Sequence, residues 1–329
     1  MLIRNGSTSK WIQAQPAPLP SADACIAVLD EEIYLLGGHH RWLQDPMGMT
    51  VEPCACVMVW SPRANIWRAA PTMSAARSMT TTCAHQGQLY VFGGLASGWG
   101  DDAIASGEVY NPAAQRWSRL PSMPVPLHGA HAVSIEDKIY VLGGSFGSGP
   151  SRVDLIEVFD TKSRSWTVLK TVLPQRDCYP VAFEGKILCF GGNNEGDAYG
   201  DIHHAHKLAE EFMNKQKIVD PKKGKKKSKK KNKGGPAWRL PAASAVEAEA
   251  KEVWCLDVST LVWTQLPDAP KKHYPEAGYF FRDGDVLRDA VSPDVNFNMA
   301  TMEWEDDPGR APLRNHKFAP QPVALAVPF

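Results

Sequence analysis

The chain has 329 residues, 43% of them hydrophobic, and its 36 basic and 36 acidic side chains cancel to a formal net charge of zero. The hydrophobic content is ample for a core, whereas 26 Gly and 26 Pro are more than a mainly helical protein would tolerate. No segment approaches membrane-spanning length, and residues 1–16 hold no apolar run of signal-peptide length, so we expect a protein of the cytoplasm or nucleus. The seven Cys are odd in number and lack framework spacing, which favours reduced thiols that pack in the core.

Four apolar runs that end at glycine doublets are the strongest local signals along the chain. The runs are 33–36, 89–92, 139–142 and 187–190, and each is followed directly by a Gly-Gly pair. Their length, β-branched residues and glycine punctuation are typical of buried strands. A tryptophan precedes each pair at an almost fixed distance, 26 residues for Trp11, Trp67 and Trp117 and 25 for Trp166. This constant register predicts an internal repeat.

A hairpin is predicted between each doublet and the next repeat tryptophan. A large apolar residue lies seven positions before the tryptophan, and turn formers such as Ser61-Pro62 lie between the two. The pairs are Trp60/Trp67, Tyr110/Trp117, Phe159/Trp166, Leu256/Trp263 and Phe297/Trp304. Successive repeat tryptophans are 56, 50, 49, 97 and 41 residues apart. The sequence therefore predicts six units, and the gap of 97 holds one period plus an insertion of about 48 residues.

The glycine doublet, the Tyr or Phe after it and the Trp at this spacing resemble the kelch motif, and the resemblance covers nearly the whole chain. It implies an all-β fold in which each repeat forms one four-stranded blade around a central axis. The doublet allows close backbone approaches that a Cβ would block, and the Trp offers a large face for packing one blade on the next. We therefore expect residues 1–329 to form a single six-bladed propeller, with no BTB or F-box domain in this chain.

The two ends of the chain are expected to complete one blade together. Residues 2–4 and 10–12 are typical of two outer strands, and residues 322–327 are typical of an inner strand. Their pairing would close the ring and remove free sheet edges. The pattern is weaker near the C-terminus, where Ala290-Val291 stand at a doublet position and the fifth and sixth repeats are degenerate.

Residues 193–250 leave the repeat and form a predicted insertion. Residues 201–219 are polar with spaced apolar positions, which predicts a short, weakly amphipathic, exposed helix. Nine Lys follow within 222–233, so residues 222–235 are expected to be a disordered loop. Without these nine, 27 basic residues face 36 acidic ones, which makes the propeller body acidic and the insertion basic. Three interpretations of Lys222–Lys233 stay open: a nuclear import signal, a non-specific contact for RNA, DNA or an anionic surface, and a loop that binds nothing.

The loops at one face of the propeller are the predicted binding surface, because the strands are committed to blade packing. The resemblance to kelch proteins implies that this face is built by the loops after the glycine doublets and after the Trp strands. Carried over to this sequence, the predicted binding residues are His39, Arg41, Arg77, Trp99, Ser145, Arg176, Tyr179, Asn193, Lys272, His273, Tyr274 and Arg314.

A basic residue recurs in this set shortly after the Pro-rich turn, at Arg77, Arg176, Lys272 and Arg314. The resemblance implies that such residues grip acidic peptides, as in kelch substrate adaptors, since guanidinium pairs with carboxylate in a fork-like geometry. The alternative is structural. An Arg at the start of an inner strand can pack its stem and donate to neighbouring carbonyls.

Two classes of function follow. The first is a non-catalytic scaffold or substrate-recognition module, which binds a protein partner such as an acidic peptide or a ubiquitin-ligase subunit and needs no cofactor or metal. The second resembles the sugar mutarotases and epimerases among kelch proteins, with an axial acid–base pair drawn from His39, His128, Glu195 and His273. A shallow basic bowl would favour the first, and a deep axial pocket with converging carboxylates and imidazoles the second.

Overall fold

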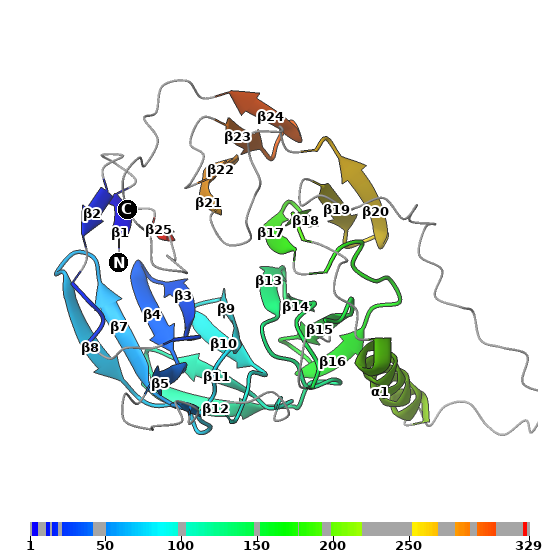
Figure 1. Ribbon diagram of the computed structural model, residues 1–329, viewed down its shortest axis with the longest axis horizontal. Coiled ribbons are helices and arrows are strands. Elements are labelled where there is room, and N and C mark those ends of the chain that lie inside the picture. Colours follow the sequence, from blue (N-terminus) through cyan, green and yellow to red (C-terminus); the bar gives the residue numbers. More distant parts are fainter. Residues whose placement is uncertain are drawn as a thin grey trace, which may run out of the picture.

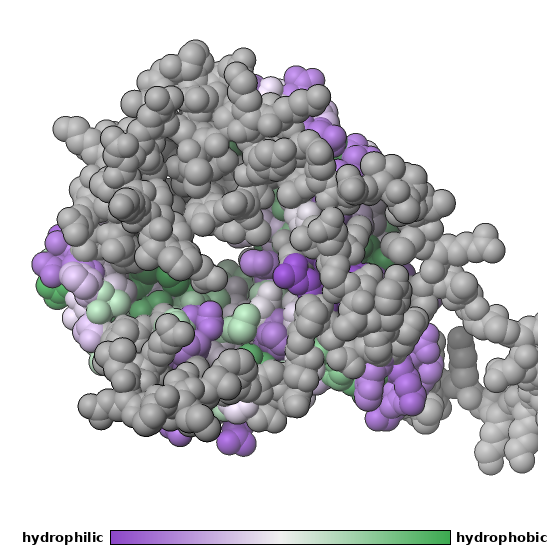
Figure 2. All heavy atoms as spheres, viewed as in Figure 1, coloured by the Kyte–Doolittle hydropathy of each residue, from purple (hydrophilic) through white to green (hydrophobic). Residues whose placement is uncertain are grey.

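The structure is a computed structural model that describes residues 2–5, 11–13, 15–18, 22–41, 51–97, 103–147, 152–176, 178–192, 199–218, 252–268, 280–289, 295–306 and 325–327. Within these residues, the strands form five four-stranded antiparallel sheets, one three-stranded sheet and one two-stranded hairpin. The predicted all-β fold made of four-stranded units is therefore confirmed. Figure 1 shows the sheets following one another in chain order around a common centre, and Figure 2 shows an opening near the middle of the same view.

The four-stranded sheets are numbered here in chain order. The first sheet contains β3 (Cys25–Leu29), β4 (Glu32–Leu36), β7 (Val57–Ser61) and β8 (Ile66–Ala70). The second contains β9 (Thr81–His85), β10 (Gln88–Phe92), β11 (Gly107–Asn111) and β12 (Arg116–Leu120). The third contains β13 (His131–Ile135), β14 (Lys138–Leu142), β15 (Ile156–Asp160) and β16 (Ser165–Val168). The fourth contains β17 (Tyr179–Phe183), β18 (Lys186–Phe190), β19 (Val253–Asp257) and β20 (Val262–Leu266). The fifth contains β21 (Phe280–Asp283), β22 (Val286–Asp289), β23 (Val295–Asn298) and β24 (Glu303–Asp306).

The segment that leads from the outer strand of one sheet to the inner strand of the next is called a junction. The first junction is 71–80, the second is 121–130 and the third is 169–178. The first two junctions pack on the glycine doublet of the sheet before them: the Gly38 N–H donates to the carbonyl of Arg77 at 2.9 Å, and the Gly94 N–H to that of Leu127 at 2.8 Å. A Cβ at Gly37 or Gly93 would lie 2.2 or 2.1 Å from the same carbonyl oxygens, and both residues have a positive φ. Gly37 and Gly93 are required because backbone from the following junction occupies the space of a side chain.

The repeat tryptophans link neighbouring sheets through their indole N–H groups. Trp117 donates to the carbonyl of Pro71 at 2.8 Å, and Trp166 to that of Pro121 at 2.9 Å. Trp304 donates to the Pro267 carbonyl at 3.0 Å, and Trp263 to the Thr171 hydroxyl at 3.0 Å. The tryptophan therefore packs on the adjacent sheet, as the sequence predicts, and also bonds to the start of a junction.

The inner strands are tied together around the centre. The Met79 N–H donates to the Asp23 carbonyl at 2.9 Å, and the Gly129 N–H donates to the Met79 carbonyl at 2.7 Å. All three residues have a positive φ. At the start of β9, the Thr81 hydroxyl donates to the Ala130 carbonyl at 2.9 Å. These bonds hold β3, β9 and β13 in a fixed relation at the mouth of the central opening.

The two ends of the chain meet in the three-stranded sheet, which we call the terminal sheet. Its order is β2 (Trp11–Gln13), β1 (Leu2–Asn5) and β25 (Leu325–Val327). The predicted pairing of N-terminal with C-terminal strands is present, with Ile3 opposite Leu325. The β1–β25 pair is parallel, unlike the strand pairs of the four-stranded sheets.

The predicted insertion begins with a docked helix. Helix α1 (Tyr199–Ile218) packs beside β16 of the third sheet, although it follows the doublet of the fourth (Figure 1). Ala205 and Ala209, four positions apart on one helix face, are buried, and Leu208 and Phe212 pack beside them. The predicted helix is therefore present and exposed on one face, but its other face is buried against the sheet, because small residues let that face approach closely. The predicted disordered loop 222–235 lies outside the described residues. No described helix combines the length and the apolar character needed to cross a bilayer.

Candidate functional site

The candidate site is the loop face, defined here as the residues after the glycine doublets (His39, Leu95, Ser145) and the ends of the junctions facing them (Ser78, His128, Arg176). The two kinds of loop are paired by backbone bridges. The Leu95 N–H donates to the Ser78 carbonyl at 2.8 Å, and the Ser145 N–H donates to the His128 carbonyl at 2.8 Å, each with a return bond. The Ala22–His39 pair repeats the arrangement in the first sheet. This platform is therefore held by main-chain bonds and does not depend on side-chain identity.

The first sheet carries an additional two-stranded hairpin on this face. After the doublet, β5 (His39–Arg41) pairs with β6 (Val51–Pro53) in a separate hairpin. Predicted binding residue His39 lies at its base, where Nδ1 is 3.5 Å from Asp23 Oδ2. The His39 side chain is 14% exposed, so only its edge could meet a partner. The Arg41 backbone lies at the end of β5, and its side chain is outside the described atoms.

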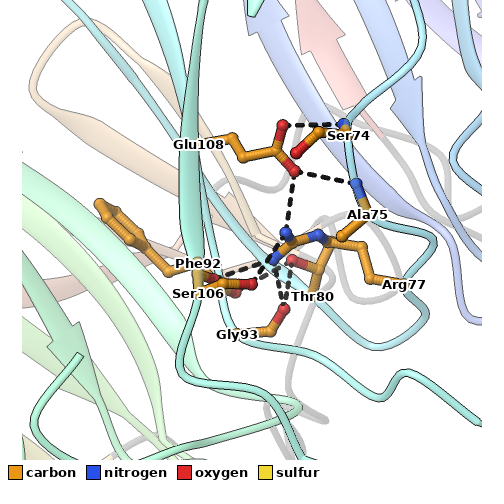
Figure 3. Close-up of polar contacts among 8 residues, drawn as sticks. All are labelled: Ser74, Ala75, Arg77, Thr80, Phe92, Gly93, Ser106 and Glu108. Atoms are coloured by element: carbon orange, nitrogen blue, oxygen red, sulfur yellow. Dashed lines mark hydrogen bonds and ion pairs between the residues drawn. The ribbon is translucent and has the colours of Figure 1, made fainter. Parts of the chain in front are cut away.

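Arg77 is buried in the protein, and Figure 3 shows its polar contacts. Its side chain is 0% exposed, and that of Glu108 on β11 is 2% exposed. Nη2 donates to Glu108 Oε1 at 2.9 Å and to the Ser106 hydroxyl at 3.2 Å. Nη1 donates to the carbonyls of Gly93 and Ser106 at 2.9 and 3.0 Å. Burial lowers the pKa of the guanidinium, and the adjacent Glu108 carboxylate opposes that shift.

This geometry corrects the role expected for Arg77. The arginine donates to carbonyls and to an internal carboxylate, which is the structural alternative, and it presents no surface to a partner. Its effect on the loop face is indirect, because it clamps the first junction to the doublet and third strand of the second sheet. Of the four recurring basic residues, Arg176, Lys272 and Arg314 stay predicted contacts for an acidic partner.

The third sheet places two histidines near the loop face. His128 is 9% exposed, and its Nε2 lies 3.4 Å from the Gly147 carbonyl. Burial lowers the His128 pKa, and the contact with Gly147 partly offsets that effect. His131, at the start of β13, meets Tyr179 of β17 edge to face with ring centroids 5.8 Å apart. Burial lowers the pKa of His131 and raises that of Tyr179, so both rings are uncharged at neutral pH.

Three further predicted residues can be located. Ser145 and Tyr179 are half-buried in the bridge and ring contact described above, and Arg176 is half-buried at the end of the third junction. Its neighbour Gln175 is buried and donates to Glu252 Oε2 at 2.9 Å. Six predicted binding residues lie outside the described residues and stay predictions: Trp99, Asn193, Lys272, His273, Tyr274 and Arg314. Among the residues that the structure describes, no group of three His, Cys, Asp or Glu side chains could hold a metal ion.

The sequence interpretation overlooked the buried carboxylates beneath the loop face. Glu108 and Glu157 occupy the second position of β11 and β15, and both are buried. Each lies at the same place in the repeat, next to the buried apolar residues of its strand. An acidic residue recurring at one register of a buried strand was the signal that could have indicated them.

Comparison with known proteins matches residues 23–214, more than half of the chain, to the family model described as the KLHDC2/KLHL20/DRC7 Kelch-repeats domain. The chain is 29% identical over 195 residues to Kelch-like protein 38 of Mus musculus, covering 58% of this chain and 32% of that protein. It is 30% identical over 157 residues to Kelch-like protein 33 of Homo sapiens, covering 47% of this chain and 28% of that protein. The matched segment thus spans about a third of these relatives.

A solved structure titled "Structure of YjhT" superposes with a TM-score of 0.51 at 17% identity, covering 61% of this chain and 68% of that one. At this identity the likeness bears on the fold alone, and that fold agrees with the four-stranded sheets described above. The comparisons lend no support to the alternative of a sugar-converting enzyme. By its repeat sequence, its sheets and the family match, the chain belongs to the kelch-repeat family.

Proposed function

We propose that this protein is a non-catalytic recognition module whose loop face binds an acidic segment of a protein partner. The main support is the platform of paired loops, which the kelch repeat supplies and which backbone bonds hold rigid. A rigid platform lets loop side chains vary without loss of the fold, as a binding surface requires.

The basic residues of the face would supply the charge for an acidic partner. Arg176 lies on the third junction, and Lys272 and Arg314 follow the later repeat tryptophans in sequence. Guanidinium groups favour paired carboxylate recognition, and a basic rim also speeds the encounter with an acidic chain. A ubiquitin-ligase subunit is one kind of partner that would fit a substrate-recognition module.

The test is affinity purification of the full chain and of an R176A/K272A/R314A variant from the same cells. Loss of the main associated proteins from the triple variant is the expected result. An R116A/R119A variant removes two exposed arginines of β12, away from the loop face, and should retain those proteins. Direct binding of the recovered partner to the purified proteins then separates contact from indirect association. Identical associated proteins in all three samples would contradict the proposal.

We further propose that the terminal sheet completes a ring of six blades. The support is a contact that repeats the pattern of the other sheets: the Trp67 indole donates to the Gln15 carbonyl at 3.0 Å, just after β2. The register partners Ile3 and Leu325 offer a test, because an I3C/L325C variant should form an internal cross-link with a short bifunctional maleimide. An I3C/K215C control, with its second thiol on α1, should not. Equal cross-linking of both pairs, or of neither, would reject closure.

The lysine run suggests a second, separable property. We propose that Lys222–Lys233 directs part of the protein into the nucleus while the rest stays in the cytoplasm, since a dense basic run is typical of import signals. Deleting these residues should shift a fluorescent fusion out of the nucleus. If the distribution stays unchanged but salt-sensitive RNA or DNA binding is lost, the run is a nucleic-acid contact instead.

A further inference from the structure

Two equivalent carboxylates, Glu108 and Glu157, lie under neighbouring parts of the loop face in different surroundings. Glu108 is opposite Val91 of β10, and Glu157 is opposite Val141 of β14, so the two occupy the same place in the second and third sheets. Their side chains have 2% and 0% relative exposure. A charged carboxylate at such a position must be paired and hydrogen-bonded, or it must hold a proton.

The Glu108 carboxylate has a counter-ion and three hydrogen-bond donors. It accepts from Arg77 Nη2 at 2.9 Å and from the backbone N–H groups of Ser74 at 2.8 Å and Ala75 at 3.3 Å. The arginine supplies the opposite charge, and all three donors come from the first junction (Figure 3). The ionised form of this carboxyl therefore has both its charge and its lone pairs matched.

Glu157 lacks the corresponding donors. The second junction places Leu127 at the register of Arg77, and Pro124, which has no N–H, at the register of Ser74. The third sheet likewise has Leu155 where the second has Ser106. Val125 N–H, at 2.8 Å from Oε1, is the remaining donor, and Oε2 is buried without a partner among the described atoms.

The surroundings of Glu157 are apolar on every described side. Its cross-strand neighbours are Val141 on β14 and Val168 on β16, and Val125 and Leu127 belong to the same hydrophobic cluster. Burial raises the pKa of Glu157 to about 8, opposed by the Val125 N–H, and no charged group contributes.

The titratable groups on neighbouring elements do not compensate Glu157. Asp154, ahead of β15, pairs with His206 of α1 at 2.7 Å. Arg77 and Glu108 satisfy one another in the sheet before. At the far end of β15, Asp160 accepts from the Ser163 N–H at 2.7 Å, and Asp137 pairs with Lys162 at 2.6 Å.

We propose that Glu157 holds a proton in the folded protein at neutral pH, and that losing this proton at alkaline pH releases the second junction from the third sheet. The proton resides on Oε2, because Oε1 accepts from Val125. An ionised carboxylate is more stable in water than in this apolar site. The side chain therefore moves toward solvent and displaces the second junction, which covers it. The same junction contains His128, which is bridged to Ser145, so the release reaches the loop face.

The direction of the effect on stability follows from the two protonation states. The raised pKa means that the folded state binds this proton more tightly than the unfolded state, whose glutamate titrates near 4.5. Stability is therefore lost as the pH rises from the unfolded value through about 8. Between pH 6 and pH 9, the unfolding constant should rise roughly a hundred-fold from this group alone.

The first experiment measures urea unfolding of the full chain from pH 6 to pH 9. The E157Q variant should lack most of that hundred-fold rise, because glutamine keeps the shape and does not ionise. The control E184Q replaces an exposed acid in the β17–β18 turn and should follow the wild type. A pH dependence of E157Q equal to that of the wild type would overturn the proposal.

The second experiment locates the change within the folded protein. Hydrogen-exchange protection of residues 121–128, corrected for the intrinsic pH effect, should fall between pH 7 and pH 9, whereas residues 71–78 of the matched first junction should keep theirs. L127R restores the missing cation and should abolish the fall if that variant folds, and E157Q should abolish it in any case. Equal behaviour of the two junctions, or a fall that persists in E157Q, would reject the proposal.

Discussion

The first and second junctions follow the same backbone path but bury different side chains. Both sit on a glycine doublet, through Arg77 on Gly38 and Leu127 on Gly94, and both deliver an N–H to a buried glutamate. The first adds an arginine and so buries an ion pair, while the second adds a leucine and buries a lone acid. The kelch repeat thus fixes the path of the chain at these junctions and leaves their electrostatics free to vary.

The largest effect should come from breaking the ion pair of the first junction. Arg77→Met should cost about 3–5 kcal/mol of unfolding free energy, because Glu108 is left buried without its counter-ion. Adding Glu108→Gln to that variant should recover part of the loss, since the stranded charge is gone. Chemical denaturation of the single and double variants measures this coupling. Additive losses would show that the two side chains do not act as a pair.

The next effect concerns the glycine on which each junction rests. Gly93→Ala places a Cβ 2.1 Å from the Leu127 carbonyl at a residue with φ of +60°, so we expect a loss of about 3 kcal/mol from strain and displacement together. Gly185→Ala is the matched control, because its φ is +74° and nothing lies within 4 Å of the added Cβ. It should cost only about 1 kcal/mol, as measured by thermal unfolding. Equal losses would mean that the close approach to the junction is unimportant.

A smaller effect is expected where the tryptophans bond to the starts of the junctions. Trp117→Phe removes the bond to Pro71 of the first junction and should cost about 1–2 kcal/mol, as measured by denaturant unfolding. Trp166→Phe removes the equivalent bond to Pro121 and should cost more, because Trp166 is 2% exposed and its indole is buried more deeply than that of Trp117. The reverse order would show that the burial of the indole does not set the cost of losing its hydrogen bond.

The sheets could be predicted from the sequence because their signals are local and repeated. The doublets, the apolar runs and the tryptophans each mark one position within a period, so four clear repeats were enough to place the strands. The fifth sheet lacks a doublet, yet Gly284, with φ of +64°, still marks the turn between β21 and β22.

The chemistry beneath the loop face could not be predicted in the same way. Arg77 stands in a loop, where exposure is the usual expectation, and its partner Glu108 is 31 residues away. Leu127 and Arg77 occupy equivalent positions. Their difference affects the protein only because Glu157 and Glu108 lie next to them, and the sequence does not show that proximity. The docking of α1 on the third sheet is also long-range, since the helix follows the fourth sheet's doublet in sequence.

The central claim is that equivalent glutamates under the two junctions differ in protonation, and it can be observed directly. Carbon-13 NMR of glutamate carboxyl groups, recorded on the full chain from pH 5 to pH 9.5, should show one buried signal that titrates near pH 8 and is missing from E157Q. If every glutamate signal has finished titrating below pH 6, Glu157 is ionised like the rest and the account of the second junction is wrong.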